Sequence, residues 1–411
     1  MLDPIAHLGL RLALGAFKTS PVESLYTEAE EPPLRLRREK LAIQYALKLS
    51  SHPENPTYKN VFDPQYENLY NAKEKTIRPL GLRLRPKLKD INLQDHTIIE
   101  TIPEIPPWTL TPPKVNFEMT KAKKSETAEI LYISKFNEIF ENHPGYSRIY
   151  TDGSKTEDAV AAAAVKVNTL VSKSYNKDIS IFSAEVRALE LALKVINKCN
   201  ENKHIIFSDS KSALEAIQNR WTANPLVRRV LELHNTLRQT KDIIFCWVPS
   251  HVGIKGNEAA DQAAKAALDS PVSDTKVPAA DWLPKSTEYI KNQHKIHWEN
   301  IQNNKLKTIV PDLSKQQQIQ CDKRKDEVVL TRLRIGHSRL THSFLMKGEP
   351  APICICCDTA YTIKHILLDC VDFADTRKLF YTATDMFDLF TNITKEKILD
   401  FIREIGLFTK I

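Results

Sequence analysis

The sequence predicts an α/β fold in which helices pack on a mixed, five-stranded sheet, with helical segments before and after that domain. Two observations carry the prediction. Between residues 146 and 270, short apolar runs typical of strands alternate with segments whose apolar residues recur every three to four positions. Three strands precede the first helix and the later strands each follow a helix, which indicates a sheet of mixed strand direction.

The composition fits a folded chain of two or three domains. The chain has 411 residues, and its 42% hydrophobic content is sufficient for a core. The formal charge of +7, from 58 Lys and Arg against 51 Asp and Glu, fits a polyanionic partner without proving one. Only 10 glycines are present, which excludes collagen-like and glycine-linker chains. We find no run of about 18 apolar residues and expect no membrane span; the interrupted apolar start does not predict a signal peptide.

Residues 1–100 precede the predicted sheet and change character along their length. Apolar residues in a Lys/Arg-rich context predict helix up to residue 50, with a break at Pro32 and Pro33. Residues 51–100 have little periodicity and several prolines, so we expect them to be mostly irregular. The stretch PEIPPWTLTPP predicts an extended linker, and we assign residues 101–145 to this linker and a lead-in.

The predicted domain at residues 146–270 contains five strands and four helices. The first helix begins at Ser183 and carries an apolar stripe with 3–4–3 spacing, formed by Val186, Leu189, Leu193 and Ile196. The strands are expected at residues 146–151, 159–167, 170–175, 204–209 and 242–249, and the other helices at 211–218, 225–239 and 257–269.

Four acids occur where this topology can bring them together. Asp152 follows the first strand, Glu185 lies in the first turn of the first helix, and Asp209 ends the fourth strand. Asp261 lies in the last helix, three residues after Glu258 and on nearly the same face. Converging carboxylates stay ionised only when cations or donors compensate them, and Mg²⁺ prefers such oxygen ligands. Two ions roughly 3.5–4 Å apart can activate a water and stabilise the leaving oxygen of a phosphodiester.

Each acid also has a purely structural interpretation. Asp152 can belong to a turn with Gly153, Glu185 can complement a helix N-terminus, and Asp209 can cap the next helix. Asp261 can be a solvated helix residue. The metal hypothesis depends on all four occurring in this order on these elements. No phosphate-binding loop of the Walker type is present, so nucleoside-triphosphate chemistry is not indicated.

Four segments of this region resemble the signature blocks of type 1 ribonuclease H. The last is the most specific, and the resemblance covers roughly residues 146–270. It implies a ribonuclease H-like fold, Mg²⁺ (or Mn²⁺) bound by Asp152, Glu185, Asp209 and Asp261, and a loop histidine, His251, that assists proton transfer or product release. The four segments are YTDGSK (150–155), SAEVRALELAL (183–193), SDSKSALEAI (208–217) and WVPSHVGIKGNEAADQAAKAA (247–267).

The chain departs from that family in two places. Its second strand is an alanine run where the family usually carries glycine, and alanine is also small enough for close packing. The region between Asp209 and Cys246 lacks the basic protrusion of some cellular members, so the grip on an RNA–DNA hybrid must come from elsewhere. The candidate substrate-binding residues are Lys211, Arg220, Trp221, Arg228 and Arg229. Alternatively, these side chains form a solvated helix face.

The C-terminal segment, residues 351–411, contains a cluster of metal-ligand residue types. Cys354, Cys357, His365 and Cys370 have spacings that suit a tetrahedral structural Zn²⁺. Cys356 is an alternative ligand to Cys354 or Cys357, and a set of buried free thiols is the alternative to a metal site. The crowding of these thiols favours metal ligation over disulfides, so we expect a reducing, intracellular compartment.

Residues 271–350 are predicted to be helical and basic. They include a stretch that can contact phosphates or form a solvated helix face. That stretch contains Arg332, Arg334, His337, Arg339 and His342.

Two flanking segments, residues 2–49 and 330–357, are similar to the region after the polymerase and to the tail of jockey-like non-long-terminal-repeat retrotransposon polyproteins. The chain contains no Asp-Asp dipeptide, the usual catalytic pair of such polymerases. This resemblance implies a carboxy-terminal piece of a larger polyprotein, or a gene model that begins within one. The resemblance to ribonuclease H implies hydrolysis of the RNA strand of RNA–DNA hybrids. The alternative is an inactive nucleic-acid-binding remnant; another metal nuclease or an integrase on the same fold is a third class.

Overall fold

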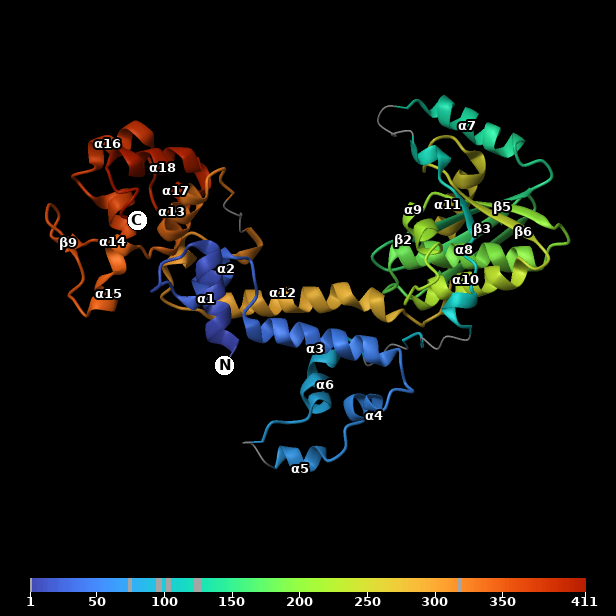
Figure 1. Ribbon diagram of the computed structural model, residues 1–411, viewed down its shortest axis with the longest axis horizontal. Coiled ribbons are helices and arrows are strands. Elements are labelled where there is room, and N and C mark those ends of the chain that lie inside the picture. The colour runs from blue at the N-terminus through green and yellow to red at the C-terminus, as the bar shows by residue number, and fades with distance from the viewer. Residues whose placement is uncertain (1, 73–75, 94–97, 101–104, 122–126, 316–319) are drawn as a thin grey trace. The chain divides into compact units, whose positions relative to one another are not determined.

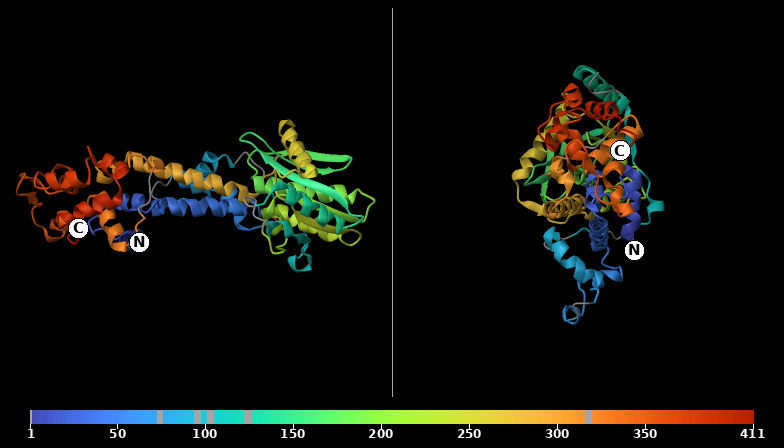
Figure 2. Two further views of the ribbon diagram at one scale, coloured as in Figure 1. Left: turned by 90° about the horizontal axis from the view of Figure 1, so that it is seen from above. Right: turned by 90° about the vertical axis from the view of Figure 1, so that its left-hand side faces the viewer.

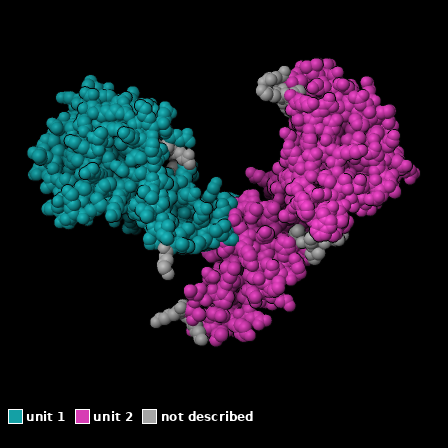
Figure 3. Space-filling view, viewed as in Figure 1, with its two compact units in different colours: residues 1–41, 287–411 teal, residues 42–286 magenta. Residues whose placement is uncertain are grey.

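The computed structural model describes residues 2–72, 76–93, 98–100, 105–121, 127–315 and 320–411. The chain divides into two compact units, one formed by residues 42–286 and the other by residues 1–41 and 287–411 (Figures 1 and 3). These units differ from the predicted order of segments, because the N-terminal 41 residues belong with the C-terminal part of the chain.

A seven-stranded mixed sheet forms the centre of residues 42–286, in the order β1-β6-β5-β2-β3-β4-β7. The five predicted strands make its middle, and one short strand extends each edge, so the prediction of a five-stranded sheet was too small. The strands are β1 (Lys114–Asn116), β2 (Ser147–Lys155), β3 (Val160–Lys166), β4 (Thr169–Tyr175), β5 (Lys203–Ser208), β6 (Asp242–Trp247) and β7 (Val272–Asp274).

Strand β2 is longer than predicted and carries Asp152 in its interior. The expected turn after Thr151 does not form, because β2 continues as an antiparallel partner of β3, with Asp152 opposite Ala163. On its other side β2 runs parallel to β5, where Thr151 pairs with Ser208. This register brings Asp209, the residue after β5, to the position beside Asp152.

Helices cover both faces of the sheet (Figures 1 and 2). The helix predicted from Ser183 is α8, which begins two residues earlier because the Ser180 hydroxyl accepts the Ser183 backbone N–H at 3.2 Å. Its predicted apolar stripe is fully buried. The helices of this part are α7 (Glu129–Glu141), α8 (Ile181–Asn197), α9 (Lys211–Ala216), α10 (Pro225–Leu237) and α11 (Lys255–Ala266), with single 3₁₀ turns at Pro107–Thr109, Glu118–Lys121, Ala267–Asp269 and Ala279–Trp282.

The alanine run of β3 allows helix α11 to approach the sheet closely. Ala163 packs against Ala263 and Ala264 of α11 in a small buried cluster. A second close approach occurs at Gly256, where an added Cβ would lie 2.3 Å from the Tyr150 ring. Helix α11 therefore needs small residues on both sides of its contact with β2 and β3.

Residues 114–116 and 129–141, which lie within the predicted linker and lead-in, pack on the sheet. Strand β1 pairs in parallel with β6, and helix α7 buries three apolar side chains in a cluster with β5 and β6. These side chains are Tyr132, Phe136 and Ile139. The described part of residues 51–100 also contains more helix than expected, since it includes α4 (Thr57–Phe62), α5 (Glu67–Asn71) and α6 (Leu80–Asp90).

The second unit is mostly helical and has its own core. Buried Trp298, Leu333, Ile366 and Phe401 belong to one hydrophobic cluster. Helices α3 (Leu34–Ser50) and α12 (Leu283–Asn300) each contribute residues to both units. The other elements are α1 (Leu2–Leu14), α2 (Val22–Glu28), α13 (Arg324–Ile335), α14 (Arg339–His342), α15 (Phe344–Lys347), β8 (Ile353–Cys354), β9 (Thr359–Ala360), α16 (Ala374–Phe380), α17 (Met386–Asn392) and α18 (Lys395–Glu404), with 3₁₀ turns at Lys305–Thr308 and Leu313–Lys315 and a π-turn at His365–Asp369.

Candidate active site and candidate metal centre

Three of the four predicted acids converge. Asp152 on β2, Glu185 on α8 and Asp209 after β5 each place a carboxylate oxygen so that all three lie within 4.8 Å of one another. Gly153 permits this approach, because an added Cβ there would lie 2.8 Å from the backbone nitrogen of Glu185. Helix α8 therefore presents Glu185 directly against the strand that carries Asp152.

The electrostatics of the three carboxylates favour the binding of a cation. Burial, followed by the charges of Asp209 and Asp261, raises the pKa of Asp152 to about 7. Burial and the neighbouring charges also raise the pKa of Glu185 well above its ordinary value. Within the part of the chain that the structure describes, the buried Oε2 of Glu185 has no hydrogen-bond partner. A hard divalent cation would satisfy this oxygen and offset the repulsion, so the donor set fits Mg²⁺ or Mn²⁺.

Asp209 is held by two side chains that were not predicted as site residues. The Asn257 amide donates to its carboxylate at 3.3 Å, and the Trp247 indole N–H donates to its backbone carbonyl at 2.9 Å. Burial raises the pKa of Asp209, whereas the Asn257 hydrogen bond opposes this shift. Asn257 lies in the GNEAAD block of the sequence, which is the signal that could have identified it.

Asp261 lies outside the group of three. Its side chain is 20% exposed and pairs with Lys265 at 2.8 Å. Its charge still raises the pKa of both Asp152 and Asp209, so it faces the same site. The structure therefore gives Asp261 a more peripheral position than the sequence suggested.

His251 lies on the loop between β6 and α11, with an exposed side chain. Its backbone is in the left-handed region, with φ of 52°, which is uncommon for a residue other than glycine. A positive charge on this side chain would lower the pKa of Asp209. This position is compatible with the predicted role in proton transfer.

The predicted substrate-binding cations divide into two kinds. Lys211 and Arg229 are exposed, and the half-exposed Arg220 stacks on exposed Trp221, with its guanidinium carbon 5.5 Å from the ring centre. The expectation that Arg228 binds substrate is contradicted by its surroundings. Its side chain is buried, pairs with Glu232 at 3.0 Å and donates to the Ile105 carbonyl. The Arg228 side chain therefore stabilises the fold.

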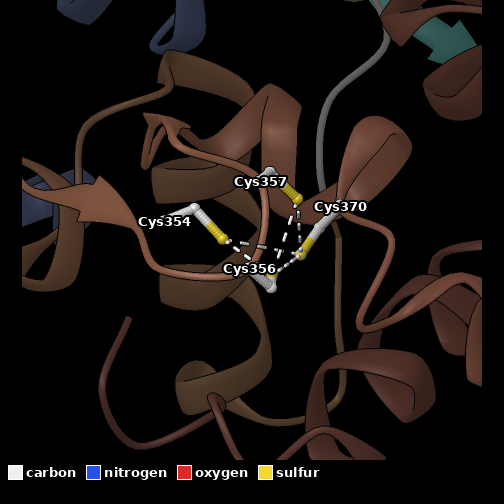
Figure 4. Close-up of side chains that lie close together, drawn as sticks. All are labelled: Cys354, Cys356, Cys357 and Cys370. Carbon is white, nitrogen blue, oxygen red and sulfur yellow. Dashed lines mark hydrogen bonds between the residues drawn. The ribbon is translucent and has the colours of Figure 1, made fainter.

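Four cysteines gather near the end of the chain (Figure 4). Cys354, Cys356, Cys357 and Cys370 place their sulfurs within 4.8 Å of one another, the shortest distance being 3.1 Å between Cys354 and Cys356. His365, predicted as a ligand, is not in this group. After Cys356, the His365 side chain nevertheless helps to lower the pKa of the Cys354 thiol.

His365 and Cys356 compete for the fourth position of a tetrahedral site. The His365 ring is buried, its Nδ1 is 3.4 Å from the Thr359 hydroxyl, and its Nε2 has no partner among the described residues. Cys356 is exposed and touches all three other sulfurs. Three thiolates plus one imidazole, or four thiolates, would both suit Zn²⁺.

Most side chains of the predicted basic stretch at residues 332–342 are buried or paired within the protein. This differs from both predicted alternatives, which were contacts to phosphates and a solvated helix face. Arg334 forms a buried ion pair with Glu28 at 2.8 Å. The buried rings of His337 and His342 stack with centroids 3.7 Å apart. Arg332 donates to the Gly15 and Ile411 carbonyls, and Arg339 is exposed.

In comparisons with known proteins, a family model matches the part of the chain that forms the sheet domain. The RNase H family model matches residues 145–269. The Pol polyprotein of equine infectious anemia virus, strain Wyoming, is 31% identical over 123 residues, which cover 28% of this chain and 10% of that protein. The Pol polyproteins of isolates 1369 and CL22 are each 30% identical over the same length and with the same coverage.

These comparisons define the class of the domain. Residues 145–269 form an RNase H domain, with weak similarity to a retroviral Pol polyprotein. The chain matches about a tenth of the length of those curated relatives.

Proposed function

We propose that the chain hydrolyses the RNA strand of RNA–DNA hybrids by two-metal-ion catalysis. The observation that carries this proposal is the convergence of Asp152, Glu185 and Asp209, with a buried Glu185 oxygen left without a partner. The RNase H domain at residues 145–269 supports the same activity.

Each residue of the site has a distinct task in this proposal. Asp152, Glu185 and Asp209 would hold Mg²⁺, and Asp261 would add negative charge at the edge of the site. When bound, the metal supplies an activated water and stabilisation of the leaving oxygen. Asn257 fixes the orientation of Asp209, and His251 receives or donates a proton at the exposed edge. Lys211, Arg220 and Arg229 contact the phosphates of the hybrid.

We also propose that Cys354, Cys357, Cys370 and either His365 or Cys356 hold one structural Zn²⁺. Four protein ligands leave no position for a catalytic water, so this centre stabilises the C-terminal segment and takes no part in hydrolysis. The wider setting that we propose is a larger polyprotein of a jockey-like retrotransposon, for which the similarity to Pol polyproteins is supporting but not specific.

The test is cleavage of a labelled RNA–DNA hybrid by the purified full chain with Mg²⁺. We expect cuts in the RNA strand and none in duplex DNA, because recognition depends on 2′-hydroxyls in an A-like minor groove. Asp209→Asn should reduce turnover at least 100-fold, since an amide is a poor ligand for a hard cation. Asp269→Asn, an exposed acid beyond α11, serves as the matched control and should retain full activity.

The alternative function, binding of nucleic acid by an inactive remnant, predicts a different result. A remnant would bind the hybrid with an affinity that weakens as salt rises, yet would cut neither strand. Cleavage of duplex DNA at the same rate as the hybrid would contradict the proposal, as would full activity in Asp209→Asn.

A further inference from the structure

Helix α7 contacts the loop that carries His251, although α7 precedes the region matched by the RNase H family. The point of contact is Gly253, which has a φ of 80° and lies against Ile133 of α7. An added Cβ on Gly253 would be 3.2 Å from Cδ1 of Ile133. The helix therefore limits the space available to the loop.

The same helix also belongs to the buried cluster that anchors the loop on both sides of Gly253. Val252 and Ile254 are 2% and 4% exposed, and both belong to the cluster that contains Tyr132, Phe136 and Ile139 of α7. A loop with left-handed residues at His251 and Gly253 needs such support, because His251 in that conformation costs free energy unless the surroundings hold it.

Helix α7 also reaches the strands that carry the carboxylates. The Phe136 ring lies 5.0 Å from Phe207 of β5, which stacks at 5.2 Å on Tyr150 of β2. Tyr150 is two residues before Asp152, and Phe207 is two residues before Asp209. One helix thus packs against the histidine loop and against both strands from which the acids extend.

We infer that α7 is a positioning element for His251, and that Ile133 holds the 248–254 loop so that His251 keeps its left-handed backbone conformation. This inference rests on the proposed ribonuclease activity and deepens it. It assigns to residues outside the matched domain a share in the rate of the chemical step. Ile133 is a positioning residue in this scheme, because it acts through the loop and touches no reacting atom.

The test compares Ile133→Ala with Ile130→Ala in the full chain. Ile130 is on the same helix but is 71% exposed, so it is a matched control. Ile133→Ala should lower kcat at least fivefold and leave KM for the hybrid unchanged within twofold, whereas Ile130→Ala should change neither. Ile133→Leu should restore most of the rate.

A double-variant cycle separates positioning from a general loss of stability. If Ile133 acts through His251, adding Ile133→Ala to His251→Ala should lower kcat by less than twofold further. Multiplicative losses, or an unchanged kcat in Ile133→Ala, would overturn the inference.

Hydrogen exchange gives a readout that does not depend on activity. Peptides covering residues 248–254 should exchange faster in Ile133→Ala than in the wild type or in Ile130→Ala, while α11 keeps its protection. If the wild type cuts no hybrid, the proposed function fails, and this exchange measurement alone decides whether α7 restrains the loop. Equal exchange in all three proteins would refute the restraint.

Discussion

In the proposed mechanism Asp152 is needed for catalysis, yet its buried charge lowers the stability of the metal-free fold. Its pKa is raised to about 7 from an ordinary value near 4, so between these pH values the folded state holds a proton that the unfolded state has lost. Stability therefore falls as pH rises through this window, and a neutral side chain removes the effect. In Mg²⁺-free buffer at pH 8, we expect Asp152→Asn to be more stable than wild type by on the order of 2 kcal/mol, while its activity is lost.

Thermal melts of both proteins between pH 5 and pH 8 measure this difference. The gap in melting temperature should widen as pH rises, and Asp269→Asn should follow the wild type. A difference in melting temperature between Asp152→Asn and the wild type that stays constant with pH would mean that the pKa of Asp152 is not raised in the folded state.

Asp261 is expected to be less sensitive than the three clustered acids. It is partly exposed and already paired with Lys265. Its replacement therefore removes negative charge from the edge of the site but removes none of the three clustered metal ligands. Asp261→Asn should lower the rate of hybrid cleavage roughly tenfold, against 100-fold or more for Asp209→Asn. Equal losses in the two variants, measured at saturating Mg²⁺, would place Asp261 among the principal ligands.

Among the elements, the packing of α11 on β2 gives the sharpest prediction. The Cβ of an alanine at position 256 would lie 2.3 Å from the Tyr150 ring, so strand and helix must separate. Gly256→Ala should cost about 1–3 kcal/mol of unfolding free energy, the usual range for overpacking. Denaturant unfolding can test this, with Gln262→Ala on the exposed side of α11 as the control. A loss below about 0.5 kcal/mol in Gly256→Ala would contradict the tight contact.

The elements also show how far the sequence was informative. The five central strands and α8 were predictable because their apolar periodicity is strong and local. Strands β1 and β7 were not, since each has three residues and exists only through pairing with β6 or β4. Helix α7 falls in the segment predicted as a linker and lead-in, although its pattern EILYISKFNEIFE could have indicated an amphipathic helix. Three acids and Cys354, Cys357 and Cys370 come together as the motifs suggested, whereas the burial of Arg228 depends on distant contacts.

At the scale of the whole molecule, the two units separate the proposed chemistries. The three clustered acids belong to residues 42–286, and the four cysteines belong to the other unit. No helix in the described ranges is both long and apolar enough to cross a membrane. The association of residues 1–41 with the C-terminal part, through contacts such as Arg334 with Glu28, depends on side chains about 300 positions apart, and no local pattern predicts it.

This separation predicts that zinc and hybrid cleavage are independent. Metal binding at the cysteine cluster would contribute on the order of 10 kcal/mol to folding of its segment, so a strong chelator should expose residues near 350–375 to protease. Once Mg²⁺ is restored, hybrid cleavage should return to within twofold of its starting rate.

Elemental analysis of the untreated chain should give about one zinc per molecule. Cys357→Ser should lose the metal. Cys356→Ser should keep it if His365 is the fourth ligand and lose it if Cys356 is, whereas an ordered segment without zinc would refute the site.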